Sequence, residues 1–524
     1  MLARLASVSF VWLLSACGAS GGVTPAKAPG SNIDNGYDAG PSSPEVKPAG
    51  LGAAPAGVPA PPAECAAFNG EKPSTCAAGD ANELLASALA QSGAARDAEL
   101  RCLEDAKELP FGFVRALRAD LAPRGCGDVV VAEQAGAPGP ARELADTLVA
   151  LGVGARLFRS VREAPLPRPP FDKPSFLKHF KEVLSPWIVE QARAVDTLSK
   201  VGPRLSGYAK AVVALEAGLA DMRFVEVARA IDLPAEMKAD PEIRETYLVA
   251  LEQALEPRAL RGRDAALVGL GELSRLGILY DARLDDARKL LSALYAGRRM
   301  DALDQLLVPA LPPAVLDTTA LKLAASLPAF YALRLDPTPN VDDAKLLRAR
   351  LERGVAPSLW LSQPAKPAAP EVAAIQRRAL FELGRRYFWA EPFARAAAIE
   401  APASDAEGSL IAGLGKVLAR GPRNAAALML GPTTLPPELR ETAALDALAK
   451  QKGPVAGMAE FDAAYVRGLA PPANDPAFWK EQRGRYERAQ KHLPADDRAG
   501  KAAAQEQAKA AADTEAELRK HSKP

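Results

Sequence analysis

The feature that most constrains the fold of this chain is a helical spacing of apolar residues, which continues with few interruptions from about residue 171 to residue 469. One segment places apolar side chains at every fourth position: Ile243, Tyr247, Leu251 and Leu255. Side chains with this spacing lie on one face of an α-helix and can be buried against a neighbouring helix. Convincing alternation of apolar and polar residues, the pattern of a half-buried strand, is lacking. The sequence therefore predicts an all-α fold, either an irregular α-solenoid or a stack of helical hairpins.

Local signals indicate where helices begin and where they pack closely. Three pairs combine a capping side chain with a proline at the first helical position: Ser185-Pro186, Asp240-Pro241 and Asp475-Pro476. Gly269-Leu270-Gly271 follows no strand, so we interpret it as a place of close helix packing and not as part of a dinucleotide-binding loop. The three valines at 129–131 are the one cluster of β-branched residues, the type that favours strands, that we note in the sequence.

Two Pro-rich stretches, 165–174 and 363–370, divide the helical region. They predict a Cys-containing helical subdomain at 65–164, a helical array at 171–362 and a C-terminal part of the array at 371–494. The remaining residues, 495–524, form a charged Ala-rich tail whose one large apolar residue is Leu518. Such a tail favours helix locally but has no large apolar face to bury, so we expect a solvated helix or a disordered segment.

The N-terminus has the features of a signal peptide. Arg4 precedes an apolar run at 8–14 that is too short to span a bilayer as a helix. The run closes with Leu14-Ser15-Ala16-Cys17, which resembles the lipobox of bacterial lipoproteins. The resemblance implies that residues 1–16 are removed and that the Cys17 thiol receives diacylglycerol. The alternative is an ordinary signal peptide that is cleaved near Ala19.

The same resemblance implies a location for the protein in the cell. An aspartate after the lipidated cysteine would favour retention in the inner membrane, and Gly18 at this position implies sorting to the outer membrane. We therefore expect a lipid-anchored protein on the periplasmic face of the outer membrane or on the cell surface. Residues 17–64 are dominated by Gly, Ala, Pro and Ser, which predicts a lipidated, disordered linker. As a flexible coil it would reach about 35–40 Å.

The charge balance limits the kinds of partner. The chain has 65 Lys and Arg against 64 Asp and Glu, a formal net charge of +1. The electrostatic field of such a chain is too weak to indicate nucleic-acid binding. The expected partners are the membrane, through the N-terminal lipid anchor, and an unidentified envelope protein or glycan.

Four cysteines besides Cys17 lie in the first part of the folded region: Cys65, Cys76, Cys102 and Cys126. An even number in an exported protein favours disulfides. Of the three possible connectivities, we prefer Cys65–Cys76 with Cys102–Cys126, because neighbours in sequence close the smallest loops. A zinc site is the alternative, but no two of these cysteines have C-x-x-C spacing and no histidine lies among them.

Residues that could carry catalysis are sparse. The histidines are His179, His492 and His521, and none stands in a metal-ligand or triad pattern. The sequence also lacks a nucleophile elbow, an H-E-x-x-H helix and a phosphate-binding loop. We therefore expect a protein that is not an enzyme, with no cofactor and no metal. The alternative is an envelope glycan hydrolase or lyase whose two carboxylates converge only in the folded chain.

Two segments resemble the helical hairpins of tetratricopeptide repeats. In the first, Leu383-Gly384 is followed by Tyr387 and Ala396, the order of large, small, aromatic and small residues in the first helix and the start of the second. In the second, the segment 290–307 predicts a turn and then a new helix from Asp301. A strict 34-residue period is lacking, and an irregular stack of amphipathic helices is the alternative.

Paired arginines next to aromatic residues are the candidate partner-binding feature. Arg385 and Arg386 precede Tyr387 and Trp389, and a groove lined by arginine and aromatic side chains would suit a peptide or an anionic glycan. The alternative is exposed arginine on an amphipathic helix whose aromatic residues belong to the core. The sequence as a whole predicts a lipid-anchored, helical-repeat interaction scaffold that assembles or couples envelope machinery. The alternatives are the glycan-active enzyme and a non-catalytic surface spacer.

Overall fold

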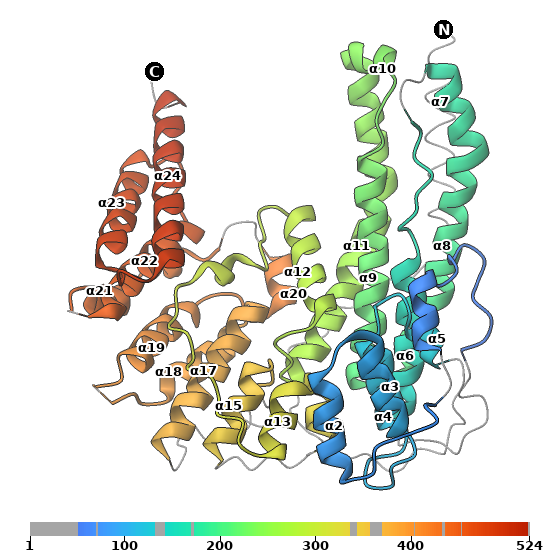
Figure 1. Cartoon of the computed structure of the whole chain (residues 1–524). Coiled ribbons are helices and arrows are strands. Elements are labelled where there is room, and N and C mark those ends of the chain that lie inside the picture. Colours follow the sequence, from blue (N-terminus) through green and yellow to red (C-terminus); the bar gives the residue numbers. More distant parts are fainter. Residues whose placement is uncertain are drawn as a thin grey trace. The chain divides into compact units, whose positions relative to one another are not determined.

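The computed structural model describes residues 51–69, 72–131, 142–168, 172–335, 343–356, 369–402, 404–431, 435–451 and 453–521 (Figure 1). These residues form helices and their connections, and the β pairing among them is one isolated antiparallel bridge between Ile278 and Val355. The all-α prediction is confirmed. The predicted signal peptide, Cys17 and most of the Pro-rich stretch at 363–370 lie outside the described residues.

The chain divides into two compact units, residues 1–272 (unit 1) and residues 273–524 (unit 2). The division lies inside one long helix, α11 (Pro241–Arg275). Neither predicted Pro-rich boundary coincides with this division. The helix α11 itself contains a proline, Pro257, and continues past it. A Pro-rich stretch marks a place without helix, but the packing of distant helices decides which segments form a unit.

Unit 1 contains a Cys-bearing group of short helices followed by longer ones. Its elements are η1 (Ala63–Phe68), α2 (Ala81–Ala90), α3 (Gly93–Cys102), α4 (Phe113–Leu121), α5 (Gly127–Val131), α6 (Arg142–Arg159), α7 (Lys173–His179), η3 (Phe180–Leu184), α8 (Ser185–Ser199), η4 (Gly202–Arg204), α9 (Gly207–Arg229), α10 (Ala235–Ala239) and most of α11. The valine cluster at 129–131 is helical, as the end of α5.

Glycines let α9 and α11 approach closely in unit 1. A Cβ added at Gly218 would stand 2.7 Å from the backbone nitrogen of Ala266, and one at Gly269 would stand 2.5 Å from Leu215 Cγ. Neither distance is compatible with a real side chain, so the two helices pack through bare backbone at these points. The interpretation of the 269–271 segment as a helix-packing site is confirmed for Gly269, whereas Gly271 faces open space.

The proline signals for helix starts are correct at two positions of three. The Asp240 carboxylate accepts hydrogen bonds from two backbone N–H groups in the first turn of α11, and Asp475 does the same for α23 (Pro476–His492). The prediction at Ser185-Pro186 is wrong, because the chain is already helical through α7 and η3 before α8 begins. A proline lacks the N–H and crowds the preceding turn, and the wider π-helical turn of η3 accommodates it.

Residues 51–62, which we call the N-terminal strap, have no regular secondary structure and lie against helices α6 and α8 of unit 1. Their backbone carbonyls accept hydrogen bonds from buried side chains: Arg156 to Leu51 O (3.0 Å), Gln191 to Gly57 O (2.7 Å) and Arg159 to Pro59 O (3.0 Å). The Leu51 side chain fills the space beside Gly152, where a Cβ would stand 2.4 Å from it. The predicted disordered linker is therefore wrong for this part, because donors on α6 and α8 replace the water that a free backbone would bind.

The four cysteines among the described residues are all paired, as predicted, but the preferred connectivity is wrong. The disulfides are Cys65–Cys126 and Cys76–Cys102, with Cα–Cα distances of 5.2 and 5.6 Å. Cys126, at the start of α5, comes next to η1, and Cys102, at the end of α3, comes next to the segment that precedes α2. The helices between the cysteines fold back, so that the nearest cysteines in space are not neighbours in sequence.

Unit 2 is a succession of short helices that ends in a longer helical hairpin. Its elements are α12 (Ala282–Leu294), η5 (Ala302–Gln305), α13 (Thr319–Ser326), α14 (Ala329–Leu335), α15 (Ala344–Glu352), α17 (Pro370–Tyr387), α18 (Ala390–Ala398), α19 (Ala406–Leu418), α20 (Ala425–Leu430), η6 (Pro437–Arg440), α21 (Ala443–Ala449), α22 (Pro454–Leu469), α23 and α24 (Arg498–His521).

One of the two predicted helical hairpins forms. Helices α17 and α18 pack together, and a Cβ at Gly384 would stand 2.9 Å from the Phe393 ring, so the small residue permits the close approach. At 290–307 the predicted turn and the helix start at Asp301 are present, but the second helix is only the short 3-10 helix η5, so no α-helical hairpin forms, and the chain continues to residue 318 without a helix. Prolines at 309, 312 and 313 exclude a regular helix from that stretch.

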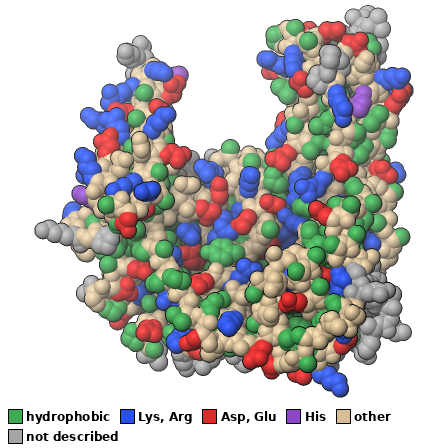
Figure 2. Space-filling model, viewed as in Figure 1, with side chains coloured by type: hydrophobic (Ala, Val, Ile, Leu, Met, Phe, Trp, Pro, Cys, Tyr) green, Lys and Arg blue, Asp and Glu red, His purple; other side chains and the backbone are tan. Residues whose placement is uncertain are grey.

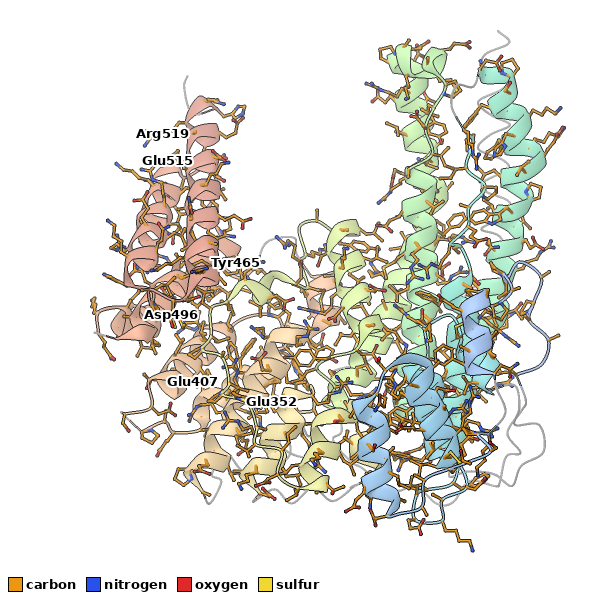
Figure 3. The ribbon with its side chains drawn as sticks, viewed as in Figure 1. Glu352, Glu407, Tyr465, Asp496, Glu515 and Arg519 are labelled. Carbon is orange, nitrogen blue, oxygen red and sulfur yellow. A yellow bond between two sulfur atoms is a disulfide. The ribbon has the colours of Figure 1, made fainter. Side chains whose placement is uncertain are left out.

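The C-terminal tail is an ordered helix, α24, that packs against α23 (Figure 1). Its buried positions include Gly500, Ala504 and Ala511, a stripe of small residues that lets the two helices approach closely. Glu515 is also buried, and ion pairs with Arg483 (3.2 Å) and Arg519 (2.6 Å) compensate for its lost hydration (Figure 3). The expectation of a solvated or disordered tail is wrong, because alanine and glycine provide a buried face without large apolar side chains.

Candidate binding surface

The structure places two of the predicted partner-binding residues in the interior of unit 2. Arg386 is 9 % exposed; its Nε donates to Leu279 O at 2.9 Å, and its guanidinium pairs with Asp285. Tyr387 is 2 % exposed and donates its hydroxyl proton to Ile278 O. Both side chains hold the segment between α11 and α12 against α17. The prediction that they line an open groove is therefore wrong, since neither can reach a partner.

Arg385 and Trp389, the other two predicted residues, are half-buried. Arg385 Nη2 lies 2.6 Å from Glu382 Oε2, one turn earlier on α17. Because that carboxylate is buried, the pair has a structural role as well as any role in binding. A partner-binding function of Arg385 and Trp389 stays a prediction.

The other arginine pair on α17 is structural. Arg377 is 2 % exposed, pairs with Asp405 and donates to Glu400 O at 3.1 Å. Arg378 donates to Glu382 at 2.9 Å and to the Pro309 carbonyl at 2.8 Å. Arginine on this helix therefore fixes loops from other parts of unit 2, because its fork of donors can satisfy several carbonyl and carboxylate groups at once.

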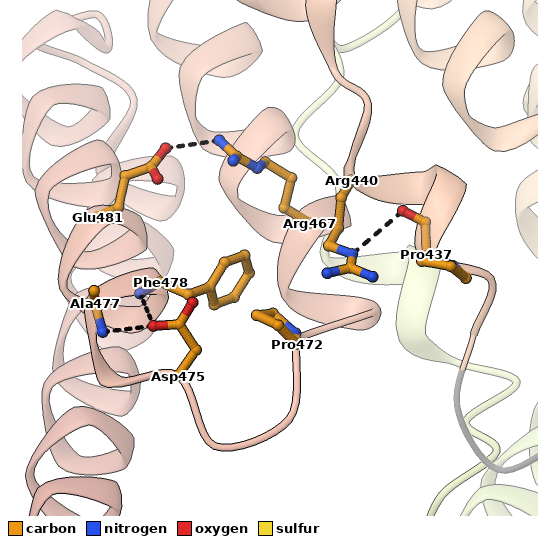
Figure 4. Close-up of a pocket in the computed structure, with 8 residues that line it drawn as sticks. All are labelled: Pro437, Arg440, Arg467, Pro472, Asp475, Ala477, Phe478 and Glu481. Carbon is orange, nitrogen blue, oxygen red and sulfur yellow. Dashed lines mark hydrogen bonds and ion pairs between the residues drawn. The ribbon is translucent and has the colours of Figure 1, made fainter.

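An open pocket in unit 2 is a better candidate for contact with a partner (Figure 4). Its volume is about 580 Å³, and η6, α22, the connection after α22 and the first turns of α23 form its walls. The residues that line it are Pro437, Arg440, Arg467, Pro472, Asp475, Ala477, Phe478 and Glu481. Sequence reasoning identified only the Asp475-Pro476 start of α23 and missed the rest, since they come from segments that only the folded chain brings together.

Two arginines give the pocket an uneven charge. Arg467 Nη1 donates to Glu481 at 2.7 Å, so this cation is neutralised locally. Arg440 donates through Nε to the Pro437 carbonyl at 3.3 Å, and its terminal amino groups have no partner in the part of the chain that the structure describes. The Asp475 carboxylate is engaged as the N-cap of α23. The pocket thus combines an available guanidinium fork with the apolar surfaces of Pro437, Pro472 and Phe478 (Figure 4).

A buried carboxyl group lies deeper in unit 2, on α22. Asp462 is fully buried; its Oδ1 accepts a hydrogen bond from Leu307 N at 2.8 Å, and its Oδ2 has no partner among the described residues. Burial raises the pKa of this carboxyl well above its usual range, and the hydrogen bond from Leu307 and the charge of Arg385 oppose the shift only in part. Asp462 is therefore held protonated over a range of pH in which an exposed aspartate is ionised.

The raised pKa of Asp462 predicts that the free energy of unfolding depends on pH through this residue. A folded-state pKa above the unfolded value means that the stabilisation is complete below about pH 4 and is lost as the pH rises through the folded-state pKa. Asp462→Asn, which keeps the acceptor for Leu307 and cannot ionise, should gain in free energy of unfolding relative to the unmodified protein as the pH increases. Denaturant unfolding of both proteins from pH 4 to pH 8 measures the difference. Parallel pH profiles would contradict the assignment.

Comparison with known proteins does not assign the chain to a family. No protein-family model, curated protein or solved structure matches it. Across the described residues, no group of three or more His, Cys, Asp or Glu side chains is arranged to hold a metal ion, and His179 makes a 2.7 Å contact with the Pro165 carbonyl. No helix in the described ranges is both long and apolar enough to cross a membrane.

Proposed function

We propose that the protein is a lipid-anchored scaffold of the bacterial envelope and that the pocket between η6 and α23 is a docking surface for a protein partner. The observation that carries the proposal is this pocket, in which the unpaired terminal groups of Arg440 lie beside apolar walls. A guanidinium fork matches a carboxylate, and prolines and a phenyl ring match an apolar side chain. The favoured partner is therefore a polypeptide segment in which an acidic residue neighbours an apolar one.

The N-terminal residue order supports the anchored position. The lipobox-like residues that end in Cys17 and the Gly18 that follows them imply a lipid anchor in the outer membrane. The N-terminal strap begins at Leu51, so residues 18–50 are the segment that separates the anchor from the folded body. Fully extended, these residues span at most about 110–120 Å.

Charge reversal in the pocket tests the docking surface. Arg440→Glu should reduce covalent cross-linking to the partner in intact cells by about tenfold, because a carboxylate would repel the acidic residue of the partner. Lys480→Glu is the matched control: Lys480 lies on α23, is exposed and does not line the pocket. Both variants should keep the helical circular dichroism of the unmodified protein. Equal capture by Arg440→Glu and Lys480→Glu would show that the partner binds elsewhere.

The anchor has a separate test. Cys17→Ser should prevent lipidation and leave the protein unprocessed or released from the membrane fraction. Fractionation and the size of the mature chain measure both effects. A Cys17→Ser protein of unchanged size that stays with the membrane would contradict lipid anchoring, whatever the result for Arg440.

A further inference from the structure

Residues 306–317 of unit 2, which we call the proline segment, run between η5 and α13 without helix, turn or bend. The sequence favours this extended course. Pro309, Pro312 and Pro313 have φ fixed at about −65°, and a residue that precedes a proline is biased to the extended region. Within 308–313, every residue except Ala310 is therefore restricted towards the backbone angles of a polyproline-II helix.

Burial along the proline segment repeats every third residue. Val308, Leu311 and Ala314 are half-buried, as is Pro309 near the start, and Ala314 packs against the core between α13 and α15. The exposed residues are Ala310, Pro312, Pro313, Val315 and Leu316. A polyproline-II helix has three residues per turn, whereas a β-strand would expose every second residue. The proline segment therefore buries one edge of a polyproline-II helix and presents the other two edges to solvent.

Arginine side chains from two helices hold the proline segment by its backbone. Arg378 on α17 donates to Pro309 O, and Arg348 on α15 donates through Nε to Pro312 O, both at 2.8 Å. These hydrogen bonds fix an extended backbone that has no strand partner. A partner that bound the proline segment would therefore have little conformational freedom to remove from it, and preorganisation of this kind favours binding.

The exposed edges of the proline segment are apolar and uncharged. Val315 is 70 % exposed, the highest fraction among the large hydrophobic side chains that the structure describes, and Leu316 is 39 % exposed. Residues 305–316 contain no Lys, Arg, Asp or Glu, although 25 % of the chain is charged and side chains of both signs alternate over the face shown in Figure 2. Single exposed apolar residues are common on proteins, whereas a rigid row of them indicates a binding surface.

We propose that the proline segment is a polyproline-II ligand for a partner protein whose binding groove is lined by aromatic side chains. Flat Trp and Tyr rings form grooves into which the edges of a polyproline-II helix fit. Their N–H and O–H groups donate to carbonyls that Arg348 and Arg378 leave available. The lack of charge in residues 305–316 matches such a groove and not a basic or acidic surface. This contact surface is additional to the pocket at Arg440, whose lining includes no residue of the proline segment.

Photo-cross-linking in intact cells that make the full chain tests the proposal. Ala310→p-benzoylphenylalanine places the photoreactive group on an exposed edge of the proline segment. The product should join position 310 to one partner protein, at a residue beside a groove of Trp or Tyr side chains. Val315→Asp should lower the yield by about tenfold, because binding would bury an unpaired charge, and should leave the thermal unfolding midpoint unchanged. Val249→Asp, which changes a 53 % exposed valine of α11, is the matched control and should alter neither value.

Several outcomes would overturn the proposal. One is the absence of any product from position 310, and another is a product with a second copy of this chain or with a membrane lipid. A linked residue away from any aromatic groove would also exclude it. An equal yield from Val315→Asp, or an equal loss from Val249→Asp, would show that the apolar edges are not recognised. A lower unfolding midpoint of Val315→Asp would assign a structural role to the proline segment. Failure of Arg440→Glu to affect docking at the pocket would leave all these results unchanged.

Discussion

Replacing Cys65 and Cys126 together by serine should lower the free energy of unfolding of unit 1 by about 4 kcal/mol. The bond joins residues 61 apart in sequence, so its loss gives the unfolded chain a large loop to explore. It also holds η1, which follows the N-terminal strap, against α5. Without the bond, only noncovalent contacts, among them the hydrogen bonds from the buried donors Arg156 and Arg159, would hold the strap.

The second disulfide is the matched control. Cys76 and Cys102 are 26 residues apart and lie inside the larger loop, so their joint replacement by serine should cost about 3.5 kcal/mol. Hydrogen exchange of the α6 amides at increasing denaturant measures both effects in unit 1. Cleavage after Arg, Lys and Glu without reduction should yield Cys65 linked to Cys126 and Cys76 linked to Cys102. Recovery of Cys65 linked to Cys76 would contradict the structure, as would a larger cost for the inner pair.

Arg386→Glu should destabilise unit 2 by about 3 kcal/mol or more. The substitution removes the donor to Leu279 O and leaves that carbonyl without this buried hydrogen bond. It also places a carboxylate near Asp285 and Asp304, whose negative charges the Arg386 guanidinium now offsets by ion pairs, the second of them at 3.6 Å. Denaturant unfolding followed by the circular dichroism of the helices measures the loss.

Arg299→Glu is the control for the effect of charge reversal alone. Arg299 is half-exposed, and its ion pair with Asp301 is at the surface, where such pairs contribute at most about 1 kcal/mol. The change should therefore alter stability by less than a third of the Arg386 effect. If both substitutions cost the same small amount, Arg386 is accessible, and a binding role for it has to be considered again.

Helix positions and caps follow from local chemistry, and they were predictable where that chemistry is sufficient. The four-residue spacing that starts at Ile243 lies on α11, where Tyr247, Leu251 and Leu255 are buried. The caps at Asp240 and Asp475 depend on side chains and backbone groups within one turn. The start predicted at Ser185 failed because a capping residue before proline does not reveal that the preceding residues are also helical.

The candidate site was less predictable than the fold. A pattern of arginine next to tyrosine and tryptophan has the same helical spacing whether the helix faces solvent or another segment. For α17 the surrounding loops cover Arg386 and Tyr387, and the covering residues lie about 100 positions away in sequence. The pocket residues Arg440 and Phe478 could not have been grouped from the sequence, because nothing local indicates that η6 meets the start of α23.

The sequence by itself determined that this chain folds into helices, where several of them begin, and that the four cysteines from Cys65 to Cys126 form pairs. These properties follow from the backbone, from the spacing of apolar side chains and from residue counts. Only the tertiary structure decided which cysteines pair, that the strap from Leu51 is docked, that an alanine-rich tail packs as α24, and that Arg386 is buried. Each of these depends on contacts between segments distant in the chain, and many different packings are compatible with the same local pattern.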